Sequence, residues 1–284
     1  MTTDPNVLHD WLTVGPASRL DGTCAERPYI ARLLGGEARV WRGADGAPVA
    51  TLDGRPAAAC IRYDYLWLWP AGTPGALFAF PEFDAPDGRR IIDCDGIGVA
   101  VSGLRMVENF LDMGHFPFVH ASYLGEVPHT EVKPYTVTID VASDEILATG
   151  CRFLQPKASS TATGALEIHY RYRVMQPFTA MLHKTAFTRP GRMDAIALFV
   201  QPVDEEHIIA YTLMAYDDDT SSDTDLVAFQ HTIFAQDKPI LENQVPKRLP
   251  LRPGRETPVR CDALSIAYRK WLLARGMRYG ALTD

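Results

Sequence analysis

The residues best suited to chemistry are gathered in one short segment, residues 108–120, with the sequence ENFLDMGHFPFVH. It places the carboxylate of Asp112 three residues before His115, and a second imidazole, His120, five residues after His115. Among phenylalanines these imidazoles would face an apolar interior, where unpaired polar groups are costly and a metal ion would satisfy them. The segment therefore predicts a metal site; satisfied core histidines at a helix end are the alternative.

The two imidazoles can converge only if the chain turns between them. Five residues correspond to about 140° around an ideal α-helix, so one continuous helix would direct His115 and His120 apart. A helix is expected from residue 104 onward, and Pro117 is expected to end it, because proline lacks the amide hydrogen and restricts Phe116. The break would let His120 fold back toward His115.

A third ligand is expected from a second helical segment, residues 223–245. Asp237 continues a row of apolar residues, Phe229 and Ile233, at helical spacing. A carboxylate in such a row needs a partner, either a metal ion or a cation such as Lys238. Two imidazoles and one carboxylate with open positions suit ferrous iron that activates dioxygen.

The elements that must hold these segments are mostly short strands. Asp53-Gly54, between two β-rich runs, is typical of a hairpin. A last helix is expected over residues 262–275 with Gly276 as its C-cap, and the helix of the third ligand is expected to be interrupted at Pro239. Strands are expected over residues 38–42, 48–52, 63–69, 135–141, 146–155, 166–174, 195–203 and 206–216. Successive strands without long helices between them predict an α+β fold, a large antiparallel sheet around long helices.

Composition narrows the class of protein. Of the 284 residues, 46% are hydrophobic and 22% charged, which excludes a disordered chain. A net charge of -7 disfavours nucleic acid, and no run reaches the roughly 18 apolar residues of a membrane span. Five scattered cysteines and an N-terminus without a signal pattern favour a reduced, cytoplasmic protein. Residues 245–284 carry nine Lys or Arg against three Asp or Glu, either a solvated surface or a face for an acidic partner.

Three strings of residues carry a family resemblance. They are Glu-Asn-Phe-Leu-Asp-x2-His-x4-His from residue 108, Gln-Asp-Lys-x-Ile-Leu-Glu-Asn-Gln from residue 236, and Tyr-Arg-Lys-Trp-Leu from residue 268. Over most of residues 76–284 the chain resembles the catalytic part of Rieske non-haem iron oxygenases, in the branch with O- and N-demethylases. The resemblance implies a helix-grip domain that usually assembles as a trimeric ring. It implies that His115, His120 and Asp237 bind iron, and that Asp112 is the carboxylate that bridges toward the Rieske cluster of a neighbouring subunit.

The sequence departs from that family where electrons should enter. A Rieske [2Fe–2S] centre needs Cys-x-His and a later Cys-x2-His, but before residue 105 the chain has one histidine, His9, and three cysteines that form neither pair. Residues 33–46 and 65–70 still resemble strands that flank a Rieske cluster. Residues 1–75 are therefore expected to be a truncated Rieske-domain remnant without cluster ligands, followed by the catalytic domain at 76–284, with the boundary at 70–75.

A function follows from this resemblance to family members that carry no cluster of their own. The chain is expected to be an oxygenase component that uses mononuclear Fe(II) and O2 to hydroxylate or oxidatively demethylate an N- or O-methyl aromatic or heteroaromatic small molecule, such as a methylxanthine. Electrons would come from a partner, a Rieske-containing reductase or a paralogous oxygenase subunit, through Asp112. Substrate-binding candidates are Phe178, Met181, Phe199 and Met214, because apolar and thioether side chains suit a flat ligand.

Two other functions compete with this one. The residues His129-x-Glu131, His183 and Arg189 or Arg192 imitate the motif of 2-oxoglutarate-dependent oxygenases, but that pattern is short and degenerate; a loop position for His129 and a strand position for His183 are expected instead. Alternatively, the chain is a catalytically inactive subunit that binds a ligand or stabilises an active paralogue.

Overall fold

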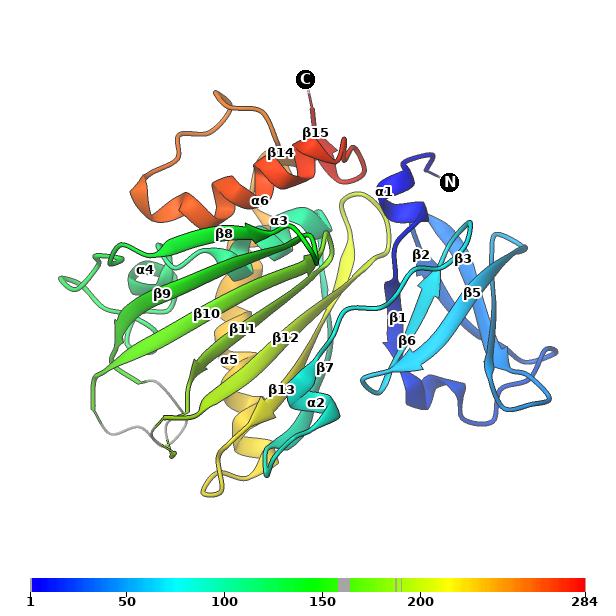
Figure 1. Cartoon of the computed structure of the whole chain (residues 1–284), viewed down its shortest axis with the longest axis horizontal. Coiled ribbons are helices and arrows are strands. Elements are labelled where there is room, and N and C mark those ends of the chain that lie inside the picture. Colours follow the sequence, from blue (N-terminus) through cyan, green and yellow to red (C-terminus); the bar gives the residue numbers. More distant parts are fainter. Residues whose placement is uncertain (1, 158–163, 187, 190, 284) are drawn as a thin grey trace.

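The described residues form two large antiparallel sheets, one short parallel strand pair and a set of helices (Figure 1). The computed structural model describes residues 2–157, 164–186, 188–189 and 191–283. A six-stranded sheet from the first part of the chain lies beside a seven-stranded sheet, and the longest helix, α5, runs behind the larger sheet in the view of Figure 1. The predicted α+β class, with a large antiparallel sheet around long helices, is confirmed.

The small sheet has the strand order β1-β6-β5-β4-β3-β2. Its strands, in chain order, are β1 (Leu12–Pro16), β2 (Tyr29–Leu33), β3 (Gly36–Arg42), β4 (Pro48–Leu52), β5 (Arg55–Arg62) and β6 (Tyr65–Trp69). The predicted hairpin joins β4 to β5, with φ of 48° at Asp53 and 74° at Gly54. Two left-handed residues give the turn whose twist matches that of the flanking strands. The strands expected at 38–42 and 48–52 are confirmed, and the one expected at 63–69 begins at Tyr65.

The large sheet has the order β7-β13-β12-β11-β10-β9-β8. Its strands are β7 (Arg90–Val99), β8 (Thr136–Asp140), β9 (Glu145–Gln155), β10 (Leu166–Gln176), β11 (Thr179–Thr185), β12 (Met193–Pro202) and β13 (Ile208–Tyr216). Five of these correspond to predicted strand ranges, and β11 contains the strand position expected for His183, whereas β7 lies outside the predicted ranges. The short connections β10–β11, β11–β12 and β12–β13 make this part of the sheet a meander.

Four helices bear on the site: α3 (Gly103–Leu111), α4 (Phe116–Val119), α5 (Asp223–Glu242) and α6 (Ala263–Ala274). The remaining short elements are α1 (Pro5–Leu8), η1 (Ala17–Leu20), α2 (Pro81–Asp84), β14 (Leu249–Pro250), η2 (Arg260–Asp262) and β15 (Ala281–Leu282). The predicted C-cap of α6 is confirmed, since Gly276 has φ of 74° and Met277 N donates to Leu272 O. The interruption predicted at Pro239 is wrong: Pro239 lies in the last turn and α5 continues through it to Glu242.

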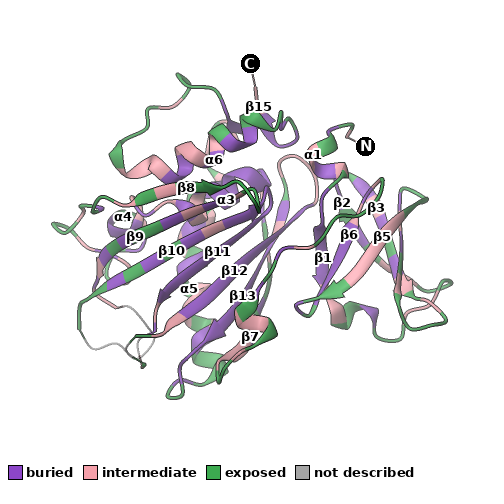
Figure 2. Ribbon diagram, viewed as in Figure 1, coloured by how far each residue is buried: buried purple, intermediate pink, exposed green. Residues whose placement is uncertain are grey.

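The large sheet is covered on both faces, which Figure 2 shows as nearly continuous buried residues along its central strands. One face packs against the helices. The other packs against the small sheet, where Trp67 and Tyr65 lie with ring centroids 5.0 and 5.2 Å from that of Phe199. Strands buried on both faces are apolar throughout rather than alternating. The chain crosses from the small sheet to the large one between Trp69 and Arg90, a stretch that contains the predicted boundary at 70–75.

Ion pairs to earlier segments neutralise part of the basic C-terminal segment. Arg248 pairs with Glu205 at 3.0 Å and Arg260 with Glu131 at 3.0 Å. Arg275 pairs with Asp144. In the part of the chain that the structure describes, no helix is both long and apolar enough to cross a membrane.

Candidate metal centre

The turn after α3 aims the first imidazole. Ser102 caps the start of α3 by accepting the amide of Arg105, and the helix ends at Leu111. Asp112 is extended, and its Oδ1 accepts the amide of Gly114 at 2.7 Å, which closes the turn. The helix therefore ends before Pro117, and the prediction that Pro117 ends it is wrong.

Pro117 instead lies in the first turn of the next short helix, α4, where no amide donor is required. His115 is the residue that precedes α4 and His120 is the residue that follows it. They are thus the N-cap and C-cap residues of α4, and the Nε2 atoms of both lie within 3.4 Å of Asp237 Oδ1 on α5. The predicted convergence is present, but a turn followed by a new helix produces it.

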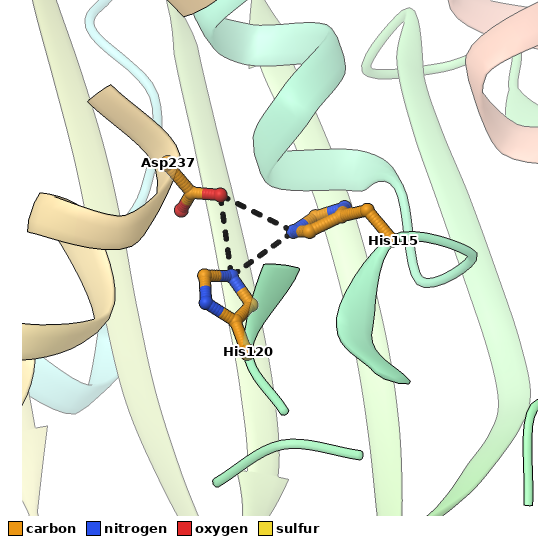
Figure 3. A group of neighbouring side chains, drawn as sticks. All are labelled: His115, His120 and Asp237. Atoms are coloured by element: carbon orange, nitrogen blue, oxygen red, sulfur yellow. Dashed lines mark hydrogen bonds and ion pairs between the residues drawn. The ribbon is translucent and has the colours of Figure 1, made fainter. Parts of the chain in front are cut away.

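His115, His120 and Asp237 point toward one common position (Figure 3). The Nε2 atoms of the two imidazoles are 3.1 Å apart. Asp237 Oδ1, from α5, lies 3.4 Å from His115 Nε2 and 3.2 Å from His120 Nε2. The chain thus brings together the three residues that the sequence analysis assigned as ligands, from segments about 120 positions apart.

The outer nitrogen of each imidazole is engaged by a side chain of its own. His115 Nδ1 lies 3.0 Å from Asp112 Oδ2, and His120 Nδ1 lies 2.9 Å from Gln236 Oε1. Both partners are acceptors, so each Nδ1 carries the proton and donates it. In the neutral imidazoles both Nε2 lone pairs therefore face the centre, which is the tautomer that binds a metal ion.

With both imidazoles neutral, the protein's own groups supply no positive charge to the centre. Two Nε2 lone pairs then face each other at 3.1 Å, and the buried Asp237 Oδ1 has no hydrogen-bond donor among the described residues. Such an arrangement is unfavourable unless a proton or metal ion lies between the atoms. Two neutral nitrogen donors and one carboxylate, with no fourth protein ligand in this group, fit a first-row divalent metal with open positions.

The electrostatics of the centre favour positive charge. Burial alone would lower the pKa of His115, but its interactions with the carboxylates of Asp112 and Asp237 raise that pKa to about 9. Burial would raise the pKa of Asp237, and the two imidazoles hold it below its ordinary value instead. The site therefore keeps its carboxylate ionised and attracts a cation.

A cavity of about 90 Å³ adjoins the centre, between the helices and the inner face of the large sheet. His115 and Asp237 form part of its wall. Most of the lining is aromatic or aliphatic: Met106, Phe110, Phe116, Leu124, Tyr170, Tyr172, Leu182, Ile196, Leu198, Tyr216, Phe229, Ile233 and Phe234. The polar lining residues besides the two ligands are Asn109, Lys184, Thr212 and Gln230. A flat, largely apolar ligand suits such a wall.

None of the four predicted substrate-binding residues lines this cavity. Met181 and Phe199 lie on the opposite face of the sheet, packed against the small sheet. Phe178 packs against Tyr279, with centroids 6.4 Å apart, and Met214 is buried but does not line the cavity. Side chains alternate along a strand, so the neighbour Leu182 faces the cavity where Met181 does not.

The residues of the 2-oxoglutarate motif do not form a site. His183 lies on β11, as expected, but its Nε2 is 2.8 Å from Glu82 Oε1 on the side of α2. Arg189 and Arg192 pair with Asp217 instead. The structure offers no arrangement of this motif among the residues that it describes.

Gln236 is the contact that the sequence analysis missed. It is half-buried and precedes Asp237 on α5. Its position in the sequence does not distinguish it from a glutamine whose side chain faces solvent. Gly125 was missed as well: a Cβ there would lie 2.7 Å from Pro117 N, so only glycine lets this loop approach α4. Both follow from contacts across the chain rather than from local pattern.

The sequence is similar to a known protein family and to named relatives. Residues 99–276 match the family of the vanillate O-demethylase oxygenase C-terminal domain. The probable methylxanthine N7-demethylase NdmC of Pseudomonas sp. (strain TJI-51) is 48% identical over 277 residues, 96% of each chain. The methylxanthine N1-demethylase NdmA of Pseudomonas putida is 29% identical over 170 residues, 59% of this chain and 45% of NdmA.

Two solved structures share the fold. The structure of Pseudomonas putida CBB5 NdmA with caffeine has a TM-score of 0.75 at 20% identity and covers 94% of this chain and 90% of NdmA. Dicamba monooxygenase bound to dicamba has a TM-score of 0.72 at 15% identity, over 95% of this chain and 97% of that one. At least 94% of the chain therefore shares the fold of these proteins.

Proposed function

Because the chain belongs to the Rieske oxygenase family of the vanillate O-demethylase oxygenase C-terminal domain, we propose that it is the oxygenase component of a methylxanthine N-demethylase. The observation that carries the proposal is the convergence of two imidazole Nε2 atoms and one carboxylate oxygen beside an apolar cavity. The family consists of non-haem iron monooxygenases, and this donor set fits ferrous iron.

His115, His120 and Asp237 would hold the iron. When bound, ferrous iron supplies the activation of dioxygen for insertion of an oxygen atom into a substrate C–H bond. Asp112 and Gln236 hold the ligand imidazoles in the metal-binding tautomer. The aromatic cavity wall excludes water and can place a methyl group beside the ligands. Hydroxylation of an N-methyl group gives a hydroxymethyl amine, which releases formaldehyde and leaves the N–H heterocycle.

Electrons would arrive from a partner molecule. The Cys-x-His and Cys-x2-His pairs of a Rieske cluster are missing from residues 1–104, so we regard residues 1–75 as a Rieske-domain remnant without a [2Fe–2S] centre. Asp112 offers an entry point, since its side chain is 29% exposed and touches His115, whereas the ligand His120 is 1% exposed. A Rieske-containing reductase or a paralogous subunit would dock there.

The substrate class follows from the wall of the cavity and from the relatives. Flat aromatic side chains suit a purine ring. The relative that is 48% identical is named for the N7-methyl group, so 7-methylxanthine is the first substrate to test. We further propose an oligomer of the trimeric-ring type, and a cytoplasmic location in keeping with five free thiols.

Iron content and formaldehyde release test this function. The protein, loaded with Fe(II) under anaerobic conditions, is expected to hold stoichiometric iron, and to release formaldehyde from 7-methylxanthine when given NADH and a Rieske-containing reductase. His115→Ala, His120→Ala and Asp237→Ala should each lose iron and turnover. His207→Ala, on the surface beside Asp204, is the matched control and should keep both.

The possible outcomes separate the competing functions. Retained stoichiometric iron in all three ligand variants would refute the metal site. Bound iron and bound substrate without turnover under any electron donor would favour the catalytically inactive subunit.

A further inference from the structure

Tyr172, a residue of the cavity wall, has a buried hydroxyl without a hydrogen-bond partner among the described residues. The residue lies on β10, is 0% exposed and lines the cavity beside His115. Its hydroxyl bonds to no group in the described part of the chain. The ring is held in place, edge-on to Phe110 at 6.4 Å and stacked with Tyr170 at 6.0 Å between centroids.

Several other buried tyrosines have paired hydroxyls, although that of Tyr279 also lacks a partner among the described residues. Tyr211 donates to Gln201 Oε1 at 2.9 Å, and Tyr268 donates to a backbone carbonyl at 2.6 Å. Tyr170, which also lines the cavity, has its hydroxyl paired with Gln155. Leaving a buried hydroxyl unpaired destabilises a protein, so an unpaired one in a cavity wall indicates that a ligand supplies the partner.

We propose that Tyr172 is a substrate-binding residue whose hydroxyl donates a hydrogen bond to a ring carbonyl oxygen of an N-methylated purinedione. The assignment rests on the proposed function and narrows it to substrates with an acceptor at that position. Burial raises the pKa of the Tyr172 hydroxyl well above its ordinary value, so the group remains a donor. A fixed donor in a mostly aromatic wall restricts how the ring lies, and so selects which methyl group faces the metal ligands.

The test uses two ligands that differ in the acceptors. 7-Methylxanthine carries two ring carbonyl oxygens, and 7-methylpurine has the same ring system and methyl group without them. Calorimetric titration of the iron-loaded protein under anaerobic conditions gives both dissociation constants. Tyr172→Phe should weaken 7-methylxanthine by about five- to tenfold and leave 7-methylpurine unchanged. Its Tm should stay equal or rise, because the variant loses no protein hydrogen bond.

Tyr170→Phe is the matched control from the same cavity wall. It should lower the Tm through the lost contact with Gln155, without changing the ratio of the two dissociation constants. Equal affinities of wild type and Tyr172→Phe for 7-methylxanthine would overturn the assignment, as would equal losses for both ligands. Formaldehyde release by the wild type tests the proposed function separately. If the wild type releases formaldehyde and Tyr172→Phe keeps the wild-type ratio of the two dissociation constants, only the role of Tyr172 is refuted. If the wild type binds neither purine, both the proposed function and the role of Tyr172 are overturned.

Discussion

Replacing the buried carboxyl Asp10 by asparagine should make the protein more stable at neutral and alkaline pH. Asp10 lies where the N-terminal segment meets the end of β10, and it is 8% exposed. Its Oδ1 accepts the amide of Trp11 at 2.9 Å and the side-chain amide of Gln176. Its Oδ2 and the Oε1 of Gln176 have no hydrogen-bond partner among the described residues. An amide group at residue 10 would bring a donor where two acceptors now stand unpaired.

The size of the effect follows from the pKa. Burial raises the pKa of Asp10 from its ordinary 3.8 to about 7. Between these values the unfolded chain ionises at Asp10 while the folded protein keeps the proton, so the free energy of unfolding falls as pH rises. The loss is complete above pH 7, and a difference of about 3 pH units corresponds to about 4 kcal/mol. Asp10→Asn cannot ionise, so its advantage over wild type should grow by up to that amount from acid to alkaline pH.

Urea unfolding at pH 5, 6, 7 and 8 measures this directly. Asp4→Asn is the matched control, because Asp4 Oδ2 accepts the amides of Arg278 at 2.6 Å and Tyr279 at 2.8 Å. Although burial opposes it, these bonds hold the pKa of Asp4 below its ordinary value. Its replacement should therefore destabilise at neutral pH and cost progressively less as pH falls. Parallel curves for Asp10→Asn and wild type over this range would refute the reasoning from burial.

Three further changes test the metal centre. Asp112→Asn should keep iron and slow reductase-driven turnover; unchanged turnover would remove Asp112 from the electron path. Gln236→Leu removes the acceptor behind His120 and should weaken iron binding by about 10- to 100-fold in a metal titration, and an unaltered affinity would mean that Gln236 does not orient the ligand. Gly125→Ala presses a Cβ to 2.7 Å from Pro117 N and should lower the free energy of unfolding by about 1–3 kcal/mol; an unchanged value would show that the loop can shift at no cost.

The grouping of ligands could be predicted from the sequence because donor chemistry constrains it. His115 and His120 lie close in the chain, and Asp237 breaks an apolar row that otherwise has no reason to hold a charge. Gln236 could not be predicted, because its role comes from contact with a segment 116 positions away. The end of α3 was predicted wrongly for a related reason. The hydrogen bond from the Gly114 amide to Asp112 Oδ1 forms a turn that ends the helix before Pro117.

The faces of the central strands were not predictable from pattern. Met181 and Leu182 are both apolar and both buried, yet one faces the small sheet and the other the cavity. Alternation of polar and apolar residues identifies the inner face only where the other face meets water. β12 is buried on both faces, and its continuous apolar run is easy to recognise as a strand. For the same reason, the sequence does not indicate which of its residues contact a ligand.

The aromatic contact between the two sheets determines which fragments of the gene can be expressed alone. A fragment that starts at residue 76 would leave Phe199, Met181 and Tyr211 facing solvent, since these side chains are buried against Tyr65 and Trp67 of the small sheet. Apolar surface of that extent drives aggregation. The N-terminal part would thus be needed for stability whether or not it carries electrons, because the small sheet covers one face of the large sheet.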